Sequence, residues 1–369
     1  MNKSFITVRN AFSVLFIMIL GNYLLLGSPF NAKQDSWLSI LIAFAIMIPV
    51  GLMFARLVKL YPEQDIFFMF SDAFGRAGGI IGTIVFSLYA VLISAMVVQN
   101  YARFFQIITL WSTPFIVIAA GIILTAVYLA KSGESALGRW SLAIIVLLFV
   151  LIAIAFLMTS QEYNFDYLFP AFNSSFENIF AGSVSLLALP FGDIVMFLAL
   201  GDSIKKGNGS YKIFMISIAV SIMLMLLVFF KNLCVLGQST MESAVFPSYA
   251  AARMASLSVF FERIEAVISY YFVFAGITKT AVCLIAAAKG SARLLKVKDY
   301  RSVVVPVGLA ALALSMTLFD NTTEMFDFIR KYPYLSLPLQ IGVPLLLWIV
   351  AEIKHASKRP LPSMNKLLD

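Results

Sequence analysis

Ten apolar segments, each about as long as a bilayer is thick, constrain the fold of this 369-residue chain more than any other feature. A helix needs about 20 predominantly apolar residues to cross a hydrocarbon core about 30 Å thick, because each residue adds 1.5 Å. The sequence predicts such spans at residues 8–28, 38–60, 80–108, 114–131, 138–159, 177–203, 210–236, 262–288, 301–320 and 334–353. We therefore expect an all-α membrane protein whose residues 1–369 form a single integral membrane domain.

The composition excludes most other classes of protein. Hydrophobic residues make up 61% of the chain and charged residues 12%, against about 45–50% and 25% in soluble domains. A soluble core of this size would leave large apolar patches exposed. The single histidine and the two cysteines are not spaced with acidic residues as the ligands of a metal ion would be. The sequence also contains no phosphate-binding glycine loop and no nucleophile elbow. We therefore expect no catalytic residues, no metal site, no cofactor and no enzymatic activity.

The distribution of charge predicts the orientation in the membrane. With the N-terminus inside, the cytoplasmic segments hold most of the 27 lysines and arginines, whereas the outer loops collect acidic residues. Loops rich in lysine and arginine remain in the cytoplasm, so both termini are expected there. The net charge of +8 therefore reflects membrane topology rather than nucleic-acid binding. Arg103 and Lys231 fall near outer span ends and are expected to anchor their helices at the membrane surface. The stretch Met241 to Phe261, interrupted by Pro247, is predicted to form an outer surface helix.

Two spans contain glycine and proline at corresponding places. Span one reads Ile19-Leu20-Gly21-Asn22-Tyr23-Leu24-Leu25-Leu26-Gly27-Ser28-Pro29, and span six reads Leu186-Leu187-Ala188-Leu189-Pro190-Phe191-Gly192-Asp193. Each heads one half of five spans, and the two cross the membrane in opposite directions. Interrupted helices at matching positions of inverted halves indicate a transporter-type binding site, since freed backbone groups must face protein, water or ligand. The alternative is that each interruption only kinks or packs its helix.

Two charged residues, Asp193 and Lys279, lie within apolar runs. An ionised side chain at the centre of a membrane helix costs about 2.5–3.5 kcal/mol, so such residues need a partner or water. Our hypothesis is that both line a central cavity and either pair with each other or hold a cation or proton. In the alternative, Asp193 accepts backbone amides at the start of the half-helix after Gly192. The alternative for Lys279 is that its long side chain extends the ammonium to the membrane surface.

Short motifs in a fixed order connect these features to a known family. They are Gly27-Ser28-Pro29 ending span one, Asp35-Ser36-Trp37-Leu38-Ser39 opening span two, Tyr61-Pro62 after span two, Ser112-Thr113-Pro114 opening span four, Gly133-Glu134 with Leu137 and Arg139 before span five, and Pro190-Phe191-Gly192-Asp193 in span six. In this order and spacing the chain resembles the B subunits of spore germinant receptors (GerAB-type), a branch of the amino acid–polyamine–organocation transporter superfamily. The similarity covers nearly the whole chain, with aspartate at position 193 where the family commonly has glutamate.

The resemblance implies a LeuT-like fold of about ten transmembrane helices in a five-plus-five inverted repeat, with helices 1 and 6 broken. In this superfamily the opened backbone of spans one and six holds the carboxylate and ammonium of the ligand, and spans three and eight close the pocket. Carried onto this chain, the ligand-binding residues are Gly21, Asn22, Tyr23, Leu189, Pro190, Phe191 and Gly192, with Tyr89 or Gln99 from span three and Tyr271 or Ala275 from span eight. The ammonium of Lys279, flanked by Thr278 and Thr280, would replace the sodium ion of some relatives.

The resemblance also implies a function. Germinant-receptor B subunits bind a small nutrient, typically an amino acid, and help to trigger spore germination with a larger membrane A subunit and a lipoprotein C subunit in the spore inner membrane. The expected partners are therefore a small-molecule germinant, these two subunits and the lipid bilayer, with no nucleic acid. A proton-coupled amino acid permease is the alternative, because its composition and topology would be the same. A scaffolding subunit with a vestigial cavity and a gated ion path are further alternatives.

Overall fold

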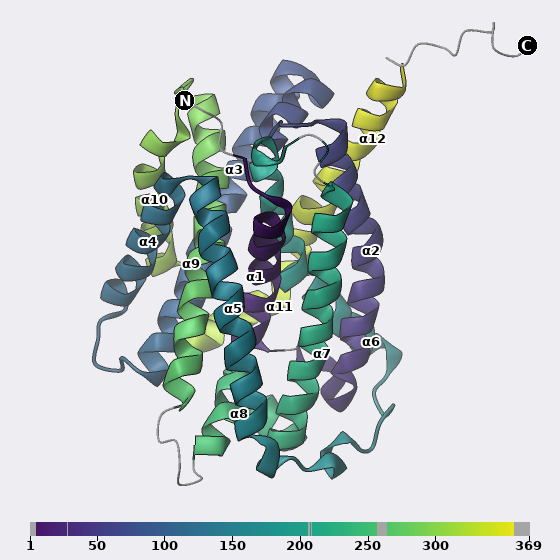
Figure 1. Ribbon diagram of the computed structural model, residues 1–369, viewed down its shortest axis with the longest axis vertical. Coiled ribbons are helices and arrows are strands. Elements are labelled where there is room, and N and C mark those ends of the chain that lie inside the picture. The colour runs from purple at the N-terminus through teal and green to yellow at the C-terminus, as the bar shows by residue number, and fades with distance from the viewer. Residues whose placement is uncertain (1–4, 28, 206, 208, 257–263, 358–369) are drawn as a thin grey trace, which may run out of the picture.

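The computed structural model describes residues 5–27, 29–205, 207, 209–256 and 264–357 (Figure 1). Every regular element among these residues is a helix, which confirms the predicted all-α class. The α-helices are α1 (Val8–Leu26), α2 (Ser36–Leu60), α3 (Ile66–Ile108), α4 (Phe115–Ser132), α5 (Glu134–Met158), α6 (Phe176–Leu186), α7 (Ser210–Ser243), α8 (Pro247–Ser256), α9 (Ile264–Leu294), α10 (Val304–Thr317), α11 (Thr322–Leu337) and α12 (Val343–Ser357). The 3₁₀ and π segments are η1 (Phe30–Asp35), η2 (Ser160–Glu162), η3 (Phe165–Leu168), η4 (Leu187–Phe191), η5 (Gly192–Ser203), η6 (Tyr300–Ser302) and η7 (Pro338–Gly342).

The helices match the predicted spans. Among the described residues, nine helical segments are long and apolar enough to cross a membrane, and the shorter apolar helix α10 occupies the predicted ninth span. Two helical segments extend further than predicted: α3 begins at Ile66 and bends at Gly75, so the predicted start at residue 80 falls soon after the bend, and the tenth span begins at Thr322 rather than at residue 334. Charged residues near these helix starts, Asp72 in α3 and Glu324 in the first turn of α11, interrupt the count of apolar residues. In α3, for example, Asp72 accepts hydrogen bonds from Tyr61 and Lys354, so the helix carries this carboxylate without leaving it unpaired.

The most buried helices form the centre of the bundle. α1 begins and α12 ends at the same end of the bundle, which we call the terminal end, and α8 lies at the opposite, distal end (Figure 1). α1, the segment Phe176–Ser203 and α9 are the most buried spans, whereas α4, α5 and the pair α11–α12 are the least buried. α3 packs along α9, and α1 packs against both α7 and α5. The interior is therefore built from the spans expected to bind the ligand.

Span six is broken as the sequence predicted. α6 ends at Leu186, and Leu189 leaves the helical conformation with φ −146° and ψ 114° before η5 begins at Gly192. The cause is Pro190, because a proline disfavours helical backbone in the preceding residue and has no amide to donate. The break lies where every neighbouring side chain is buried, apart from the half-buried Leu189.

Span one differs from the expectation. Gly21, Asn22 and Tyr23, whose backbone was expected to be open, lie within the continuous helix α1, so that part of the prediction was wrong. The helix ends at Gly27, whose φ of 78° is one that glycine adopts without strain. Ser28 lies outside the described residues. A glycine interrupts a helix only where its backbone leaves the helical region, and Gly21 instead allows another helix to approach closely, as described below.

The longest connection at the distal end contains a short surface helix, as predicted. α7 bends at Gly237, where φ is 67°, and α8 then begins at Pro247, a residue favoured in the first turn of a helix. Residues 257–261 of the predicted helix lie outside the described residues. A Cβ placed on Gly27 would lie 3.0 Å from the ring of Pro247, so the start of α8 packs directly on the distal end of α1.

Candidate functional site

Helices α1, α3 and α9 meet at a close contact around Gly21. A Cβ placed on Gly21 would lie 2.7 Å from the Cβ of Ala275 in α9 and 3.3 Å from the hydroxyl of Tyr101 in α3. Gly276 of α9 also permits close packing, because a Cβ placed on it would lie 2.8 Å from the ring of Tyr101 in α3. Any larger residue at Gly21 would have to push these helices apart. We call this contact, with Asn22 and Tyr271 beside it, the α1–α3–α9 site.

Three buried polar groups near this contact have no hydrogen-bond partner in the described part of the protein. They are the amide nitrogen of Asn22 and the hydroxyls of Tyr101 and Tyr271, all on residues with at most 2% of their surface exposed. An unsatisfied buried polar group costs about 1–3 kcal/mol, and native proteins contain few of them. All three are able to donate a hydrogen bond, so the arrangement suits a ligand that brings acceptor oxygens.

Aromatic rings separate the α1–α3–α9 site from the distal end. Phe104, one turn beyond Tyr101, contacts Phe246 and Phe272 edge-on, with ring centroids 4.9 and 5.2 Å apart. Tyr249 of α8 completes the cluster at 5.9 Å from Phe104. Such edge-to-face contacts add about 0.5–1.5 kcal/mol each to the burial of the rings. The cluster connects α3, α8 and α9 and closes the α1–α3–α9 site on its distal side.

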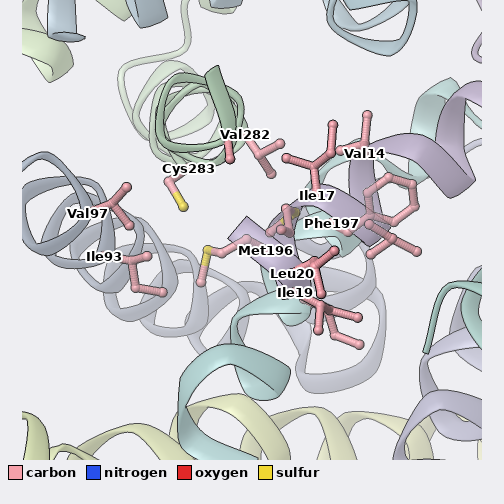
Figure 2. Close-up of a cluster of buried hydrophobic side chains, with 14 of the residues drawn as sticks. Val14, Ile17, Ile19, Leu20, Ile93, Val97, Met196, Phe197, Val282 and Cys283 are labelled. Atoms are coloured by element: carbon pink, nitrogen blue, oxygen red, sulfur yellow. The ribbon is translucent and has the colours of Figure 1, made fainter. Parts of the chain in front are cut away.

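An apolar layer separates the same site from the terminal end. Figure 2 shows that side chains from four helices gather there between the helix axes. They are Val14, Ile17 and Leu20 from α1, Ile93 and Val97 from α3, Met196 and Phe197 from η5, and Val282 and Cys283 from α9. All of them are buried, so the layer is apolar and packed with side chains. The site is therefore enclosed from both ends of the bundle.

A buried ion pair lies beside the broken part of span six. The ammonium of Lys279 in α9 contacts and donates to Asp193 in η5, and both side chains are at most 1% exposed. Gln340 of η7 donates to the same carboxylate at 2.8 Å, and the hydroxyl of Tyr332 donates to it at 3.4 Å. Tyr89 of α3 is bonded to Tyr332 at 2.8 Å. These five residues, which we call the Asp193 network, join α3, η5, α9 and span ten.

The Asp193 network also satisfies the broken backbone. Gln340 donates to the carbonyl of Ala188 at 2.9 Å, one residue before the non-helical Leu189. A Cβ placed on Gly192 would overlap the side chain of Gln340, so only glycine leaves room for this contact. Lys279 does not extend to the membrane surface, since its ammonium is paired inside the bundle. The break is thus stabilised by protein groups and does not depend on a bound ligand.

A second charge cluster lies at the terminal end. The ammonium of Lys289, near the end of α9, pairs with Glu134 at the start of α5 and with Asp202 at the end of η5. Ser203 donates to Glu134, and Arg293, one turn after Lys289, pairs with Asp65 at 3.3 Å. Burial raises the pKa of the Asp65 carboxyl, and the nearby Lys289 ammonium partly offsets that effect. The cluster joins α3, α5, η5 and α9 beyond the apolar layer.

Three residues predicted for the site point elsewhere. Tyr23 donates to the carbonyl of Met225 in α7 at 3.1 Å. Gln99 donates to the carbonyl of Phe319 after α10 at 2.9 Å. Thr278 accepts a hydrogen bond from Trp140 of α5 at 3.1 Å and so faces away from Asp193. Of the other predicted residues, the structure brings Gly21, Asn22, Tyr271 and Ala275 together in one place, and Tyr89, Gly192, Asp193 and Lys279 in the other.

Neither place is arranged to hold a metal ion. Among the described residues, no group of three or more His, Cys, Asp or Glu side chains has a metal-binding arrangement. The chemistry available is therefore hydrogen bonding and charge pairing: unpartnered donors in the α1–α3–α9 site, and a paired carboxylate and ammonium in the Asp193 network. Such groups are able to bind and position a ligand.

The sequence relatives identify the family. A family model described as spore germination protein matches residues 5–323 of the chain. The chain belongs to the spore germination protein family. Spore germination protein KB of Bacillus subtilis (strain 168) is 24% identical over 365 residues, covering 96% of each chain. Putative spore germination protein YfkT of the same organism is 24% identical over 324 residues, covering 88% of this chain and 89% of that relative. The resemblance to GerAB-type germination permeases is thereby confirmed.

A solved structure shows which fold this germination protein has. It is Mhp1, described as a nucleobase-cation-symport-1 family transporter in a closed conformation with bromovinylhydantoin bound. The TM-score is 0.64 with 12% sequence identity, and the match covers 99% of this chain and 96% of that one. At this identity the likeness shows the fold alone, which is LeuT-like as predicted. Together with the family, it makes the chain a multi-pass membrane protein of transporter type.

Four residues of these two places in the germination protein were missed from the sequence. Tyr101 lies in the same span as the chosen Tyr89 and Gln99, and no motif fixed which face of that helix points inward. Tyr332 was missed because span ten was predicted to start two residues later. Gln340 did give a signal, as a polar residue between Pro338 and Gly342 in an apolar run. Gly276 was missed because the adjacent residue, Ala275, was chosen from that span instead.

Proposed function

We propose that this germination protein is the transporter-like subunit of a spore germinant receptor, and that it binds a small nutrient, an amino acid, in the α1–α3–α9 site. The observation that carries the proposal is the set of three unpartnered donors on Asn22, Tyr101 and Tyr271 in an enclosed interior site. The family supports a role in germination, and the transporter fold supports a small-molecule ligand. The larger A subunit and the lipoprotein C subunit are the proposed partners, in the spore inner membrane with both termini cytoplasmic.

The chemistry of the site favours a ligand without net charge. The three donors suit the two oxygens of a carboxylate, because charge-assisted hydrogen bonds of this type are the strong ones. The buried pair of Asp193 and Lys279 is neutral as a whole, so this pair selects neither an anion nor a cation. Leu189, Phe191 and Ala275 add apolar surface. A zwitterion with a small apolar side chain fits these conditions better than a charged one.

The ion pair of Lys279 has a proposed role in this function. Its ammonium lies against η5, as a bound cation would, and it is covalently part of α9. Ligand binding by this germination protein therefore requires no sodium ion. Leu189, Pro190, Phe191 and Gly192 act in the proposal as the flexible part of span six, which moves when the ligand enters or leaves.

One experiment separates a receptor from a proton-coupled permease, the second candidate, which the transporter fold favours. The purified chain in proteoliposomes is tested for equilibrium binding of labelled small neutral amino acids and for their uptake under an imposed proton gradient. Binding without uptake supports the receptor subunit. Saturable uptake that collapses with the gradient makes the protein a permease instead.

A matched set of variants tests the site itself. Tyr101→Phe and Tyr271→Phe each remove one unpartnered hydroxyl and keep the ring, and each is expected to weaken ligand binding about tenfold, the equivalent of one lost hydrogen bond to a charged group. Tyr23→Phe is the control, because that hydroxyl is bonded to Met225 in α7. Unchanged affinity in both site variants, with normal insertion, would place the ligand elsewhere.

A further inference from the structure

Lys231 of α7 is a buried cation with no counterion among the residues that the structure describes. The residue is 6% exposed and has no hydrogen bond or ion pair to any residue that the structure describes. The sequence suggested that it anchors α7 at the membrane surface, and the structure places it inside the bundle instead. The other buried lysines of the described chain, Lys279 and Lys289, both have carboxylate partners.

The side chain of Lys231 lines a cavity of about 40 Å³ between five helices. Most of the wall is apolar and comes from α1, α5, α7 and α9, with Leu24, Leu148 and Phe272 among its residues. None of the described lining residues is acidic. The cavity is therefore a small, partly open and mostly apolar space with Lys231 in its wall.

Two hydroxyls join Lys231 in the cavity wall. Ser248, in the first turn of α8, accepts a hydrogen bond from Asn232 at 3.1 Å, so its own proton is free to donate. Tyr271 has an unpartnered, buried hydroxyl. The described lining residues therefore offer up to three donors, one of them charged, and no carboxylate. This is the opposite of a cation site.

An uncompensated charge in such a place is unfavourable by several kcal/mol, and the usual remedy is a partner of opposite charge. A water molecule needs about 10–15 Å³ of such space, so 40 Å³ is enough for one small ion. We propose that this cavity is a binding site for a small monovalent anion, a chloride ion or a compact carboxylate, held by Lys231 with Ser248 and Tyr271.

The position of the cavity gives the anion a structural consequence. Its three donors come from α7, α8 and α9, and the start of α8 also packs on the end of α1 at Gly27. An anion there links the distal helix α8 to α7 and α9. It also adjoins the α1–α3–α9 site, with which it shares Tyr271, but it requires no nutrient ligand and is tested without one.

The test measures anion binding by the full chain in detergent, with ³⁶Cl⁻ at constant ionic strength and gluconate as the large replacement anion. Acetate is tested as a competitor. We expect one saturable chloride per chain, and we expect Lys231→Met to weaken its binding at least tenfold while Lys231→Arg retains it. Lys212→Met is the matched control, because Lys212 lies on the same helix and is exposed.

Competition by acetate identifies a site that accepts carboxylates, and its failure to compete identifies a halide site; both support the proposal. Absence of saturable binding by the unaltered chain overturns it, as does equal affinity in Lys231→Met. If Lys231→Met does not fold, Ser248→Ala takes its place and is expected to weaken chloride binding several-fold. Unchanged affinity in that variant also overturns the proposal.

Discussion

Breaking the buried pair of Asp193 and Lys279 is the sharpest test of how the interior is held together. Asp193→Asn keeps the shape of the side chain and an oxygen for Gln340, which donates to Asp193 at 2.8 Å. It removes the negative charge that Lys279 faces. Because both side chains are at most 1% exposed, water does not replace the lost partner. The variant therefore isolates the charge from the packing.

The expected loss of stability follows from that burial. Removing one member of a buried ion pair typically costs about 3–5 kcal/mol, because the other charge is left uncompensated. Asp193→Asn and Lys279→Met should each lose about this amount. The double variant leaves no unpaired charge in the interior. Its loss of stability should therefore be well below the sum of the two single losses, with a coupling energy of about 2 kcal/mol or more.

The assay is denaturant or thermal unfolding of the four proteins in one detergent, evaluated as a double-mutant cycle. Equal insertion and expression of the four chains is the control for failed assembly. Losses that simply add within about 0.5 kcal/mol would refute the pairing, since independent sites behave in that way. Asp193→Asn should weaken ligand binding more than it reduces membrane insertion. Equal losses of binding and insertion would indicate that Asp193 has a purely structural role.

Three further outcomes are expected. Gly21→Leu should abolish ligand binding and cost about 1–3 kcal/mol by overpacking against Ala275, yet leave membrane insertion intact, as binding and protease-protection assays would measure. Lys289→Met should destabilise the protein by about 3 kcal/mol in the same unfolding assay, because Glu134 stays buried without its cation. Burial raises the pKa of Asp65 above its usual 3.8, so the folded state binds this proton more tightly than the unfolded chain. Stability from this group is full below about pH 4 and is lost as pH rises through the raised pKa, and Asp65→Asn should flatten this slope in midpoints measured from pH 4 to 7.

Much of the fold could be predicted because hydrocarbon imposes strict rules. Spans have a minimum length, and charges inside them need partners, which led directly to Asp193 and Lys279. The break of span six was predictable because Pro190 acts on its own chain, through the missing amide and the clash with Leu189. Each of these signals is local, and none depends on which helix packs next to which.

The parts that sequence could not supply depend on neighbours. From the sequence, Gly21 is compatible either with an interrupted helix or with close packing of two helices. Which of these occurs depends on Ala275, on a helix more than 250 residues away in the chain. Gln340 is one polar residue in an apolar run until the structure places it against Asp193 and the freed carbonyl of Ala188. Lys231 had the sequence signature of a surface anchor, and only the fold places α5, α8 and α9 around it.

The two charge clusters limit how the interior is able to move. η5 carries a carboxylate near each end, Asp193 and Asp202, and α9 carries the matching lysines, Lys279 and Lys289, ten residues or about 15 Å apart. Sliding η5 along α9 would break both pairs at several kcal/mol each, more than a small ligand readily offsets through its differential affinity for two states. We therefore expect η5 and α9 to move as one body against α1, whose contacts with them are apolar in the layer of Figure 2 and depend on glycine at Gly21. In the proposed function, a ligand that enters at Gly21 would act on that boundary. Its effect must then reach the terminal end, where Lys289 joins this body to α5.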